Sequence, residues 1–203
     1  MSGYWSVKKE CIKNKYIEEL LDRLEATEIW RSSQEKCRDY DEGIHVLEST
    51  FTQHKEKQSQ LFFIGNGGSA AIASHMTADF MKNGGMNTYS LYDHSVLTCM
   101  GNDYGYEYIF SRSMELLVKP DDLVVAISSS GNSENILYAI EAARKKKAAI
   151  ITFTGFKRDN RAKQMGDLNV YVPCEKYGIV ESIHNLILQQ IVDMIVDRDG
   201  VEL

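Results

Sequence analysis

The sequence has few of the residues that mark several protein classes. Its 203 residues include only four cysteines (Cys11, Cys37, Cys99 and Cys174), and none is paired in a Cys-x-x-Cys spacing. This argues against a zinc ribbon and a disulfide framework. With only two prolines, no proline-rich linker stands out. The net charge of −6 argues against a nucleic-acid-binding surface, which is normally basic.

Long apolar runs are also scarce. No stretch reads as a signal-peptide core, and none approaches the length of a membrane span. We therefore expect a cytoplasmic protein with no nucleic-acid partner and no membrane partner.

The chain divides by pattern into a helical extension over residues 1–58 and an α/β domain over residues 59–203. Residues 5–58 lack strand-like alternation. They carry apolar residues at helical spacing, first Ile12, Tyr16, Ile17, Leu20, Leu21 and Leu24, then Ile44, Leu47 and Phe51. Two amphipathic helices before an α/β core are typical of a subunit interface, so we expect a homo-oligomer. Packing within the same chain is the alternative.

From residue 61 onward, short apolar runs alternate with helical patterns. We expect strands at 61–64, 88–92, 123–127, 149–153 and 169–172, with helices from about residues 69, 109, 133, 160 and 181. This order predicts a mostly parallel sheet with helices on both faces. Ligands of such folds bind at the carboxyl ends of the strands.

A glycine loop follows the first of these strands. Gly65, Gly67 and Gly68 let the backbone turn and approach a ligand closely, and Ser69 stands at the start of the next helix. Backbone N–H groups at a helix N-terminus favour an anion such as phosphate. The alternative is an ordinary strand-to-helix turn.

A serine loop at residues 128–133, SSSGNS, gives the stronger signal. It lies between the apolar strand LVVAI and a helical segment, so hydroxyls and backbone donors converge on a volume of phosphate size. The loop matches neither GxxxxGK[ST] nor GxGxxG. We therefore expect a phosphorylated ligand and no nucleotide cofactor.

Two histidine–carboxylate pairs are candidates for proton transfer. His75 and Asp79 are four residues apart on one predicted helix, and Glu181 and His184 are three apart on another. Such pairs provide either an acid–base set or metal ligands. Taken alone, they are also compatible with a surface pair and with a helix-dipole partner.

Several motifs in order, GNGGS at 65–69, GNDYGYEYIFSR at 101–112 and ISSSGNSENI at 127–136, closely resemble the sugar isomerase (SIS) domain family. The likeness is to its phosphoheptose isomerase subfamily and covers Leu61 to Asp197. It implies a three-layer, flavodoxin-like fold with a five-stranded parallel sheet, N-terminal helices that build a homotetramer, and substrate bound between subunits. It also implies phosphate binding by Ser128, Ser129, Ser130 and Ser133, and sugar contacts from Asn66, Gly67, Gly68, Ser69, Asn102 and Asp103.

The implied reaction converts sedoheptulose 7-phosphate into D-glycero-D-manno-heptose 7-phosphate for surface glycans such as lipopolysaccharide or capsule. This aldose–ketose isomerisation needs a base, an acid and stabilisation of an enediol. His75 and Asp79 lie where the subfamily has a histidine and a glutamate. On the last helix the subfamily has a glutamine and, eight residues later, a histidine, and we place His184 and Val192 at those positions.

Asp79, His184 and Glu181 are therefore our predicted catalytic residues. His75, Asp79 and His184 form a candidate zinc site. Because Val192 can neither move a proton nor bind a metal, the alternative is a sugar-phosphate-binding regulatory or scaffold protein without turnover.

Overall fold

The computed structural model describes residues 6–200, with side chains from residue 15 onward. The ends of the two predicted domains, residues 1–5 and 201–203, and the side chain of Ile12 lie outside this range. The described chain forms one seven-stranded sheet in the order β2-β1-β7-β6-β5-β3-β4. Its strands are β1 (Glu28–Arg31), β2 (Glu35–Lys36), β3 (Leu61–Gly65), β4 (Thr88–Tyr89), β5 (Leu123–Ser128), β6 (Ala149–Thr154) and β7 (Leu168–Tyr171).

The sheet combines a parallel part with an antiparallel edge. Strands β4, β3, β5, β6 and β7 are parallel neighbours, which confirms the predicted five-stranded parallel sheet. Strand β1 pairs antiparallel with β7, and β2 with β1. The sheet therefore has two strands more than expected.

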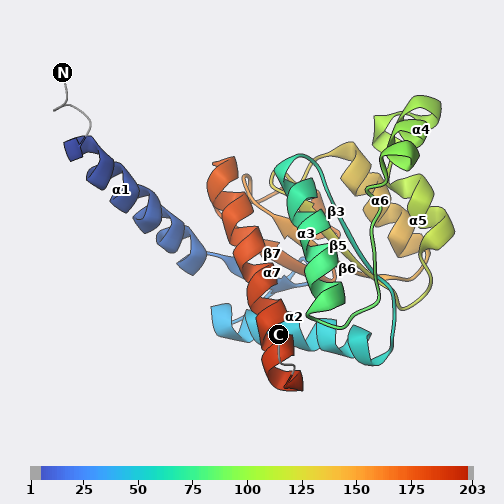
Figure 1. Cartoon of the computed structure of the whole chain (residues 1–203), viewed down its shortest axis with the longest axis horizontal. Helices are drawn as coiled ribbons and strands as arrows, with labels where there is room; N and C mark the ends of the chain where they lie inside the picture. The colour runs from blue at the N-terminus through green and yellow to red at the C-terminus, as the bar shows by residue number, and fades with distance from the viewer. Residues whose placement is uncertain (1–5, 201–203) are drawn as a thin grey trace.

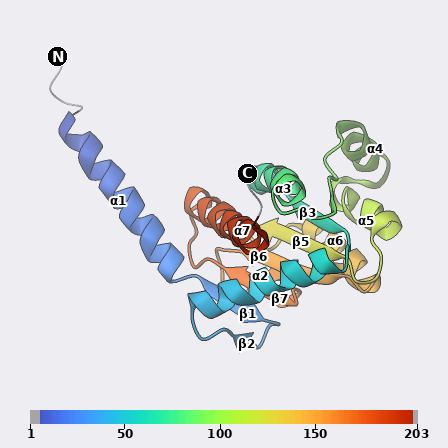
Figure 2. The same cartoon turned by 60° about the horizontal axis from the view of Figure 1, so that its bottom comes forward.

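Helices cover both faces of the sheet (Figures 1 and 2). The described helices are α1 (Ser6–Glu25), α2 (Tyr40–Glu56), α3 (Gly68–Lys82), α4 (His94–Tyr104), α5 (Ser111–Leu117), α6 (Glu134–Lys145) and α7 (Tyr177–Asp199), with short 3₁₀ turns η1 (Tyr106–Tyr108) and η2 (Ala162–Gln164). α2, α3 and α7 pack on one face, and α5 and α6 on the other.

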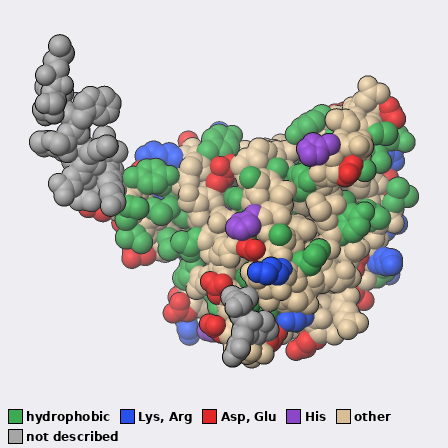
Figure 3. All heavy atoms as spheres, in the orientation of Figure 1, with side chains coloured by type: hydrophobic (Ala, Val, Ile, Leu, Met, Phe, Trp, Pro, Cys, Tyr) green, Lys and Arg blue, Asp and Glu red, His purple; other side chains and the backbone are tan. Residues whose placement is uncertain are grey.

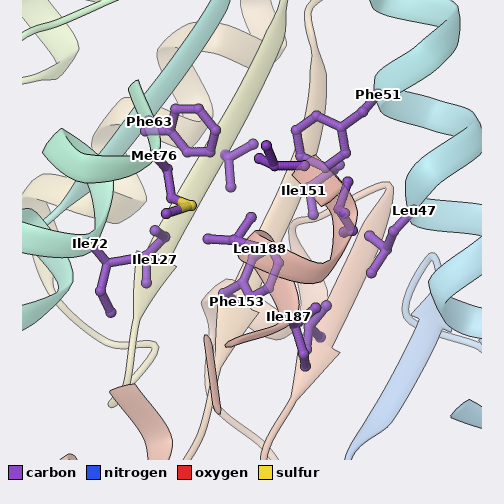
Figure 4. Packing of buried hydrophobic residues seen from close by; sticks show 14 of the residues in the cluster. Leu47, Phe51, Phe63, Ile72, Met76, Ile127, Ile151, Phe153, Ile187 and Leu188 are labelled. Carbon is purple, nitrogen blue, oxygen red and sulfur yellow. The ribbon is translucent and has the colours of Figure 1, made fainter. Parts of the chain in front are cut away.

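Alternate side chains of the parallel strands enter two separate cores. Phe63, Val125 and Phe153 belong to the core under α2, α3 and α7, whereas Phe62 and Val124 belong to the core under α5 and α6. Figure 4 shows Phe63, Phe153 and their neighbours packed in the first core. Because both faces are buried, these strands read as continuous apolar runs, the signal by which they were predicted.

The N-terminal region differs from the prediction. Residues 28–36 form the β1–β2 hairpin, so the expectation of an entirely helical region before residue 58 was wrong. The helix expected from residue 160 is only the turn η2, whereas α4 was not predicted. α7 begins at Tyr177, four residues before the expected start.

Helix α1 projects from the body of the molecule (Figure 1). Tyr16, Ile17 and Leu21 are about half exposed on it. Figure 3 shows the hydrophobic side chains gathered over its described part. An apolar stripe left uncovered within one chain is typical of a surface that packs against a partner.

Helix α7 is long and apolar enough, by length and composition, to cross a membrane. It lies instead against the sheet, with Ile183, Ile187, Leu188 and Ile191 fully buried. Its apolar character is explained by its place in the core.

Candidate functional site

A cavity of about 390 Å³ lies at the carboxyl ends of β3 and β5. Both predicted loops open into it. Its lining residues are Asn66, Gly67, Gly68, Ser69, Ile127, Ser128, Ser129, Ser130, Ser133, Tyr177 and Glu181. The structure therefore brings together nine of the predicted residues around one hollow, and it adds Tyr177, which the sequence reasoning missed.

The serine loop offers donors to this cavity. The hydroxyl of Ser129 is buried and has no hydrogen-bond partner among the described residues. Ser133 is the N-cap of α6, yet its side chain makes no capping hydrogen bond. Because a buried, unpaired hydroxyl costs free energy, these groups fit a ligand that accepts hydrogen bonds.

The glycine loop supplies backbone donors from the other side. Gly67 has φ of +55°, a conformation that favours glycine, and it precedes α3 without a side-chain cap. The first N–H groups of α3 have no acceptor within their own helix. Two helix N-termini, those of α3 and α6, therefore meet at one cavity and favour an anion there.

Glu181 places a carboxyl group beside these donors. A Cβ atom added to Gly68 would lie 2.3 Å from its Oε2, so the Glu181 carboxyl group keeps this position only while residue 68 is glycine. Burial raises the pKa of Glu181 above the usual value for a glutamate. A carboxyl group with a raised pKa is suited to exchange a proton with a ligand.

Asp79 lies further down α3 and has its own partners. His75 Nε2 is 3.1 Å from Asp79 Oδ2, and Gln189 on α7 donates a hydrogen bond to the same oxygen. Asp79 is eleven residues beyond Gly68, which places it roughly 16 Å along the helix from the cavity. Within one chain, Asp79 and the loops do not share a site.

His184 lies in the core, away from both groups. It is fully buried, its ring packs edge-on against Phe153, and its Nε2 donates to the carbonyl oxygen of Thr154 at 3.1 Å. Burial lowers the pKa of this imidazole to about 4. The structure therefore does not support His184 as a catalytic residue or as a metal ligand.

The rotation of α7 about its axis explains why His184 does not reach the site. His184 and Val192 both lie on its buried stripe, together with Val180 and Leu188. Glu181 and Gln189, also eight residues apart, are the side chains that reach α3. Gln189 was not predicted because its amide carries no acid–base signal; its half-buried place beside the apolar stripe of α7 is the pattern that could have indicated it.

The zinc set does not assemble. Among the residues whose side chains are described, no three histidine, cysteine, aspartate or glutamate side chains cluster as metal ligands. His75 and Asp79 are adjacent, but the third expected ligand, His184, points into the core. The residues present in one chain therefore do not fit this zinc site.

Asn102 and Asp103 also lie outside the cavity. Both are exposed on α4, where the Asn102 amide donates to Asp103 Oδ1 at 2.8 Å. Figure 1 shows α4 standing apart from α3 and α7. One chain does not bring these two side chains to the loops.

Comparisons with known proteins agree with this arrangement. The SIS domain family model matches residues 26–155. The phosphoheptose isomerase of Rhodospirillum rubrum is 40% identical over 133 residues, covering 62% of this chain and 69% of the relative. That of Helicobacter pylori is 32% identical over 160 residues, covering 76% and 81%.

Solved structures of phosphoheptose isomerases have the same fold as this chain. A phosphoheptose isomerase structure from Neisseria gonorrhoeae has a TM-score of 0.69 at 30% identity, covering 78% of this chain and 85% of its own. One from Francisella tularensis has a TM-score of 0.79 at 24% identity, covering 93% and 98%, and supports the fold alone. The chain belongs to the SIS domain family, in its phosphoheptose isomerase subfamily.

Proposed function

We propose that this protein is an aldose–ketose isomerase that interconverts sedoheptulose 7-phosphate and D-glycero-D-manno-heptose 7-phosphate. The observation that carries the proposal is the cavity in which the unpaired Ser129 hydroxyl, two helix N-termini and the Glu181 carboxyl group meet. The names of the relatives support the substrate class. With this activity we propose a cytoplasmic role in supplying heptose for lipopolysaccharide or capsule.

The serine loop would hold the phosphate. The hydroxyls of Ser129 and Ser133, with the first N–H groups of α6, would donate hydrogen bonds to its oxygens. The N–H groups of the glycine loop would bind the carbonyl oxygen and stabilise the negative charge of the enediolate.

Glu181 would move the proton. In the ketose it takes a proton from C1, the electron pair forms the C1–C2 double bond, and the C2 carbonyl oxygen gains a proton. Return of the proton to C2, with loss of the proton on the C1 oxygen, gives the aldose. The reaction is redox-neutral overall and needs no external oxidant.

Asp79 would act in a neighbouring copy. It lies too far from the cavity of its own chain, and the resemblance implies substrate bound between subunits. The half-exposed apolar stripe of α1 supports a homo-oligomer, for which we propose a tetramer. Asn102 and Asp103, exposed on α4, would reach the sugar in the same manner.

The test is turnover of sedoheptulose 7-phosphate by the purified protein and three variants. We expect Ser129→Ala to raise KM about tenfold through the lost hydrogen bond, and Glu181→Gln to lower kcat by a factor of about 100 or more. Glu56→Gln, an exposed change on α2 away from the cavity, is the matched control and should behave as wild type. Absence of turnover in folded wild-type protein would refute the proposal.

A further inference from the structure

A pair of amide side chains joins the two loops of the cavity. Asn66 Nδ2 donates to Asn135 Oδ1 at 2.9 Å, and Asn135 Nδ2 donates back to Asn66 Oδ1 at 2.9 Å. Asn66 belongs to the glycine loop. Asn135 lies in the first turn of α6 and is only 2% exposed. The reciprocal bonds fix the orientation of both amides.

Tyr106 adds a third bond from a different segment. Its hydroxyl group donates to Asn66 Oδ1 at 3.0 Å, although the side chain itself is 62% exposed. The carbonyl oxygen of the Asn66 side chain therefore accepts two hydrogen bonds, and the amide keeps one free N–H. Most of the bonding capacity of Asn66 is used within the protein.

Asn66 stands at a point where three hollows meet. It lines the candidate cavity, a second hollow of about 470 Å³ beside Tyr92 and Phe110, and a third of about 500 Å³ beside Asn135 and Tyr138. The position of this one side chain decides where the wall of the candidate cavity lies. That position is set by Asn135 and Tyr106.

We propose that Asn135 is a positioning residue, which acts through Asn66 to hold the glycine loop at the distance from the serine loop that a sugar phosphate requires. This inference rests on the proposed function. A sugar phosphate must contact both loops at once, whereas inorganic phosphate needs only the serine loop. Loss of the amide pair should therefore affect the two ligands differently.

The first test compares the two ligands in Asn135→Ala by calorimetry and turnover. We expect kcat/KM for sedoheptulose 7-phosphate, and its affinity, to fall about tenfold, because two partly buried hydrogen bonds are lost. The affinity for inorganic phosphate should stay within about twofold, since the serine loop keeps its own hydroxyls. Equal losses for both ligands would overturn the proposal, because Asn135 would then support the serine loop itself.

A double-mutant cycle separates positioning from general structure. If Asn135 acts through Asn66, the variant Asn66→Ala/Asn135→Ala should be no less active than Asn66→Ala alone. Additive losses would contradict the proposal. Asn169→Ala removes another fully buried amide, on β7 and bonded to Thr152 and Thr154, and should lower stability without changing the ratio of the two affinities.

Tyr106→Phe keeps the proposal testable if Asn135→Ala fails to fold. The tyrosine is exposed, so loss of its hydroxyl group should leave folding intact. It should lower kcat/KM several-fold in the wild-type background and not at all in Asn66→Ala. An effect of equal size in both backgrounds would refute the role of Asn66. Wild-type protein that binds phosphate but turns over no sugar phosphate would instead refute the proposed function.

Discussion

His184 has a side chain that could act as an acid or a base, but its position in the core keeps it away from the cavity. Its imidazole is fully buried, and its Nδ1 has no hydrogen-bond partner among the described residues. Thr154, the acceptor for its Nε2, also accepts the N–H of Val172 at 2.9 Å. Removing the imidazole therefore leaves no unpaired carbonyl oxygen.

We predict that His184→Leu keeps full turnover and loses part of the acid sensitivity of the fold. The pKa of about 4 is below that of an unfolded histidine, so the unfolded state binds the proton more readily. Stability contributed by the neutral imidazole is present above pH 6.5 and is lost as pH falls toward 4, by roughly 3 kcal/mol. Urea unfolding at pH 7 and pH 4.5 measures this loss of stability. A large loss of turnover in a folded His184→Leu variant would contradict the prediction and indicate that His184 takes part in catalysis.

The stability that Glu181 contributes depends on pH in the opposite sense. Its pKa is raised in the folded state by burial, so its contribution to stability is fully present below the pKa of an unfolded glutamate and is lost as pH rises through the folded pKa. We predict that Glu181→Gln is more stable than wild type at pH 8 and that the difference shrinks near pH 4. Thermal unfolding at the two pH values tests this, and a variant less stable at pH 8 would contradict it.

At the scale of elements, the contact between the start of α3 and α7 positions the Glu181 carboxyl group. In Gly68→Ala the new Cβ would meet only the flexible end of the Glu181 side chain, which can move aside. We predict at least a tenfold loss of kcat/KM with a change in unfolding free energy of about 1 kcal/mol or less. Chemical denaturation beside turnover checks both, and loss of stability in proportion to activity would count against the assignment.

The burial of each element explains which of them could be predicted from the sequence. The strands from Leu61 and Leu123 were predictable because burial on both faces makes them continuous apolar runs. The β1 strand was missed because only Ile29 of its four residues is buried, so the pattern carries no alternation. In α7 both Val192 and Gln189 fit a helix, and only contacts with α3 reveal which one faces the neighbouring helix.

For the whole molecule, the central question is how Asp79 and the cavity can serve one reaction. The apolar stripe of α1 and the distance between Asp79 and Gly68 both favour sites completed by a second copy. The helical rise of the α3 backbone sets this distance, so no rotamer of Asp79 removes it.

Mixed oligomers of two inactive variants provide the decisive measurement. If each site takes Asp79 from one copy and Glu181 from another, then Asp79→Asn and Glu181→Gln, unfolded and refolded together in equal amounts, should recover up to about a quarter of wild-type turnover through random pairing of subunits. Each variant refolded alone is the control and should remain inactive. In every subunit of the mixture one of the two residues is replaced. A mixture with no recovery, in protein shown to have exchanged subunits, would therefore place Asp79 and Glu181 in the same chain's site, whereas turnover by Asp79→Asn refolded alone would remove Asp79 from the chemistry.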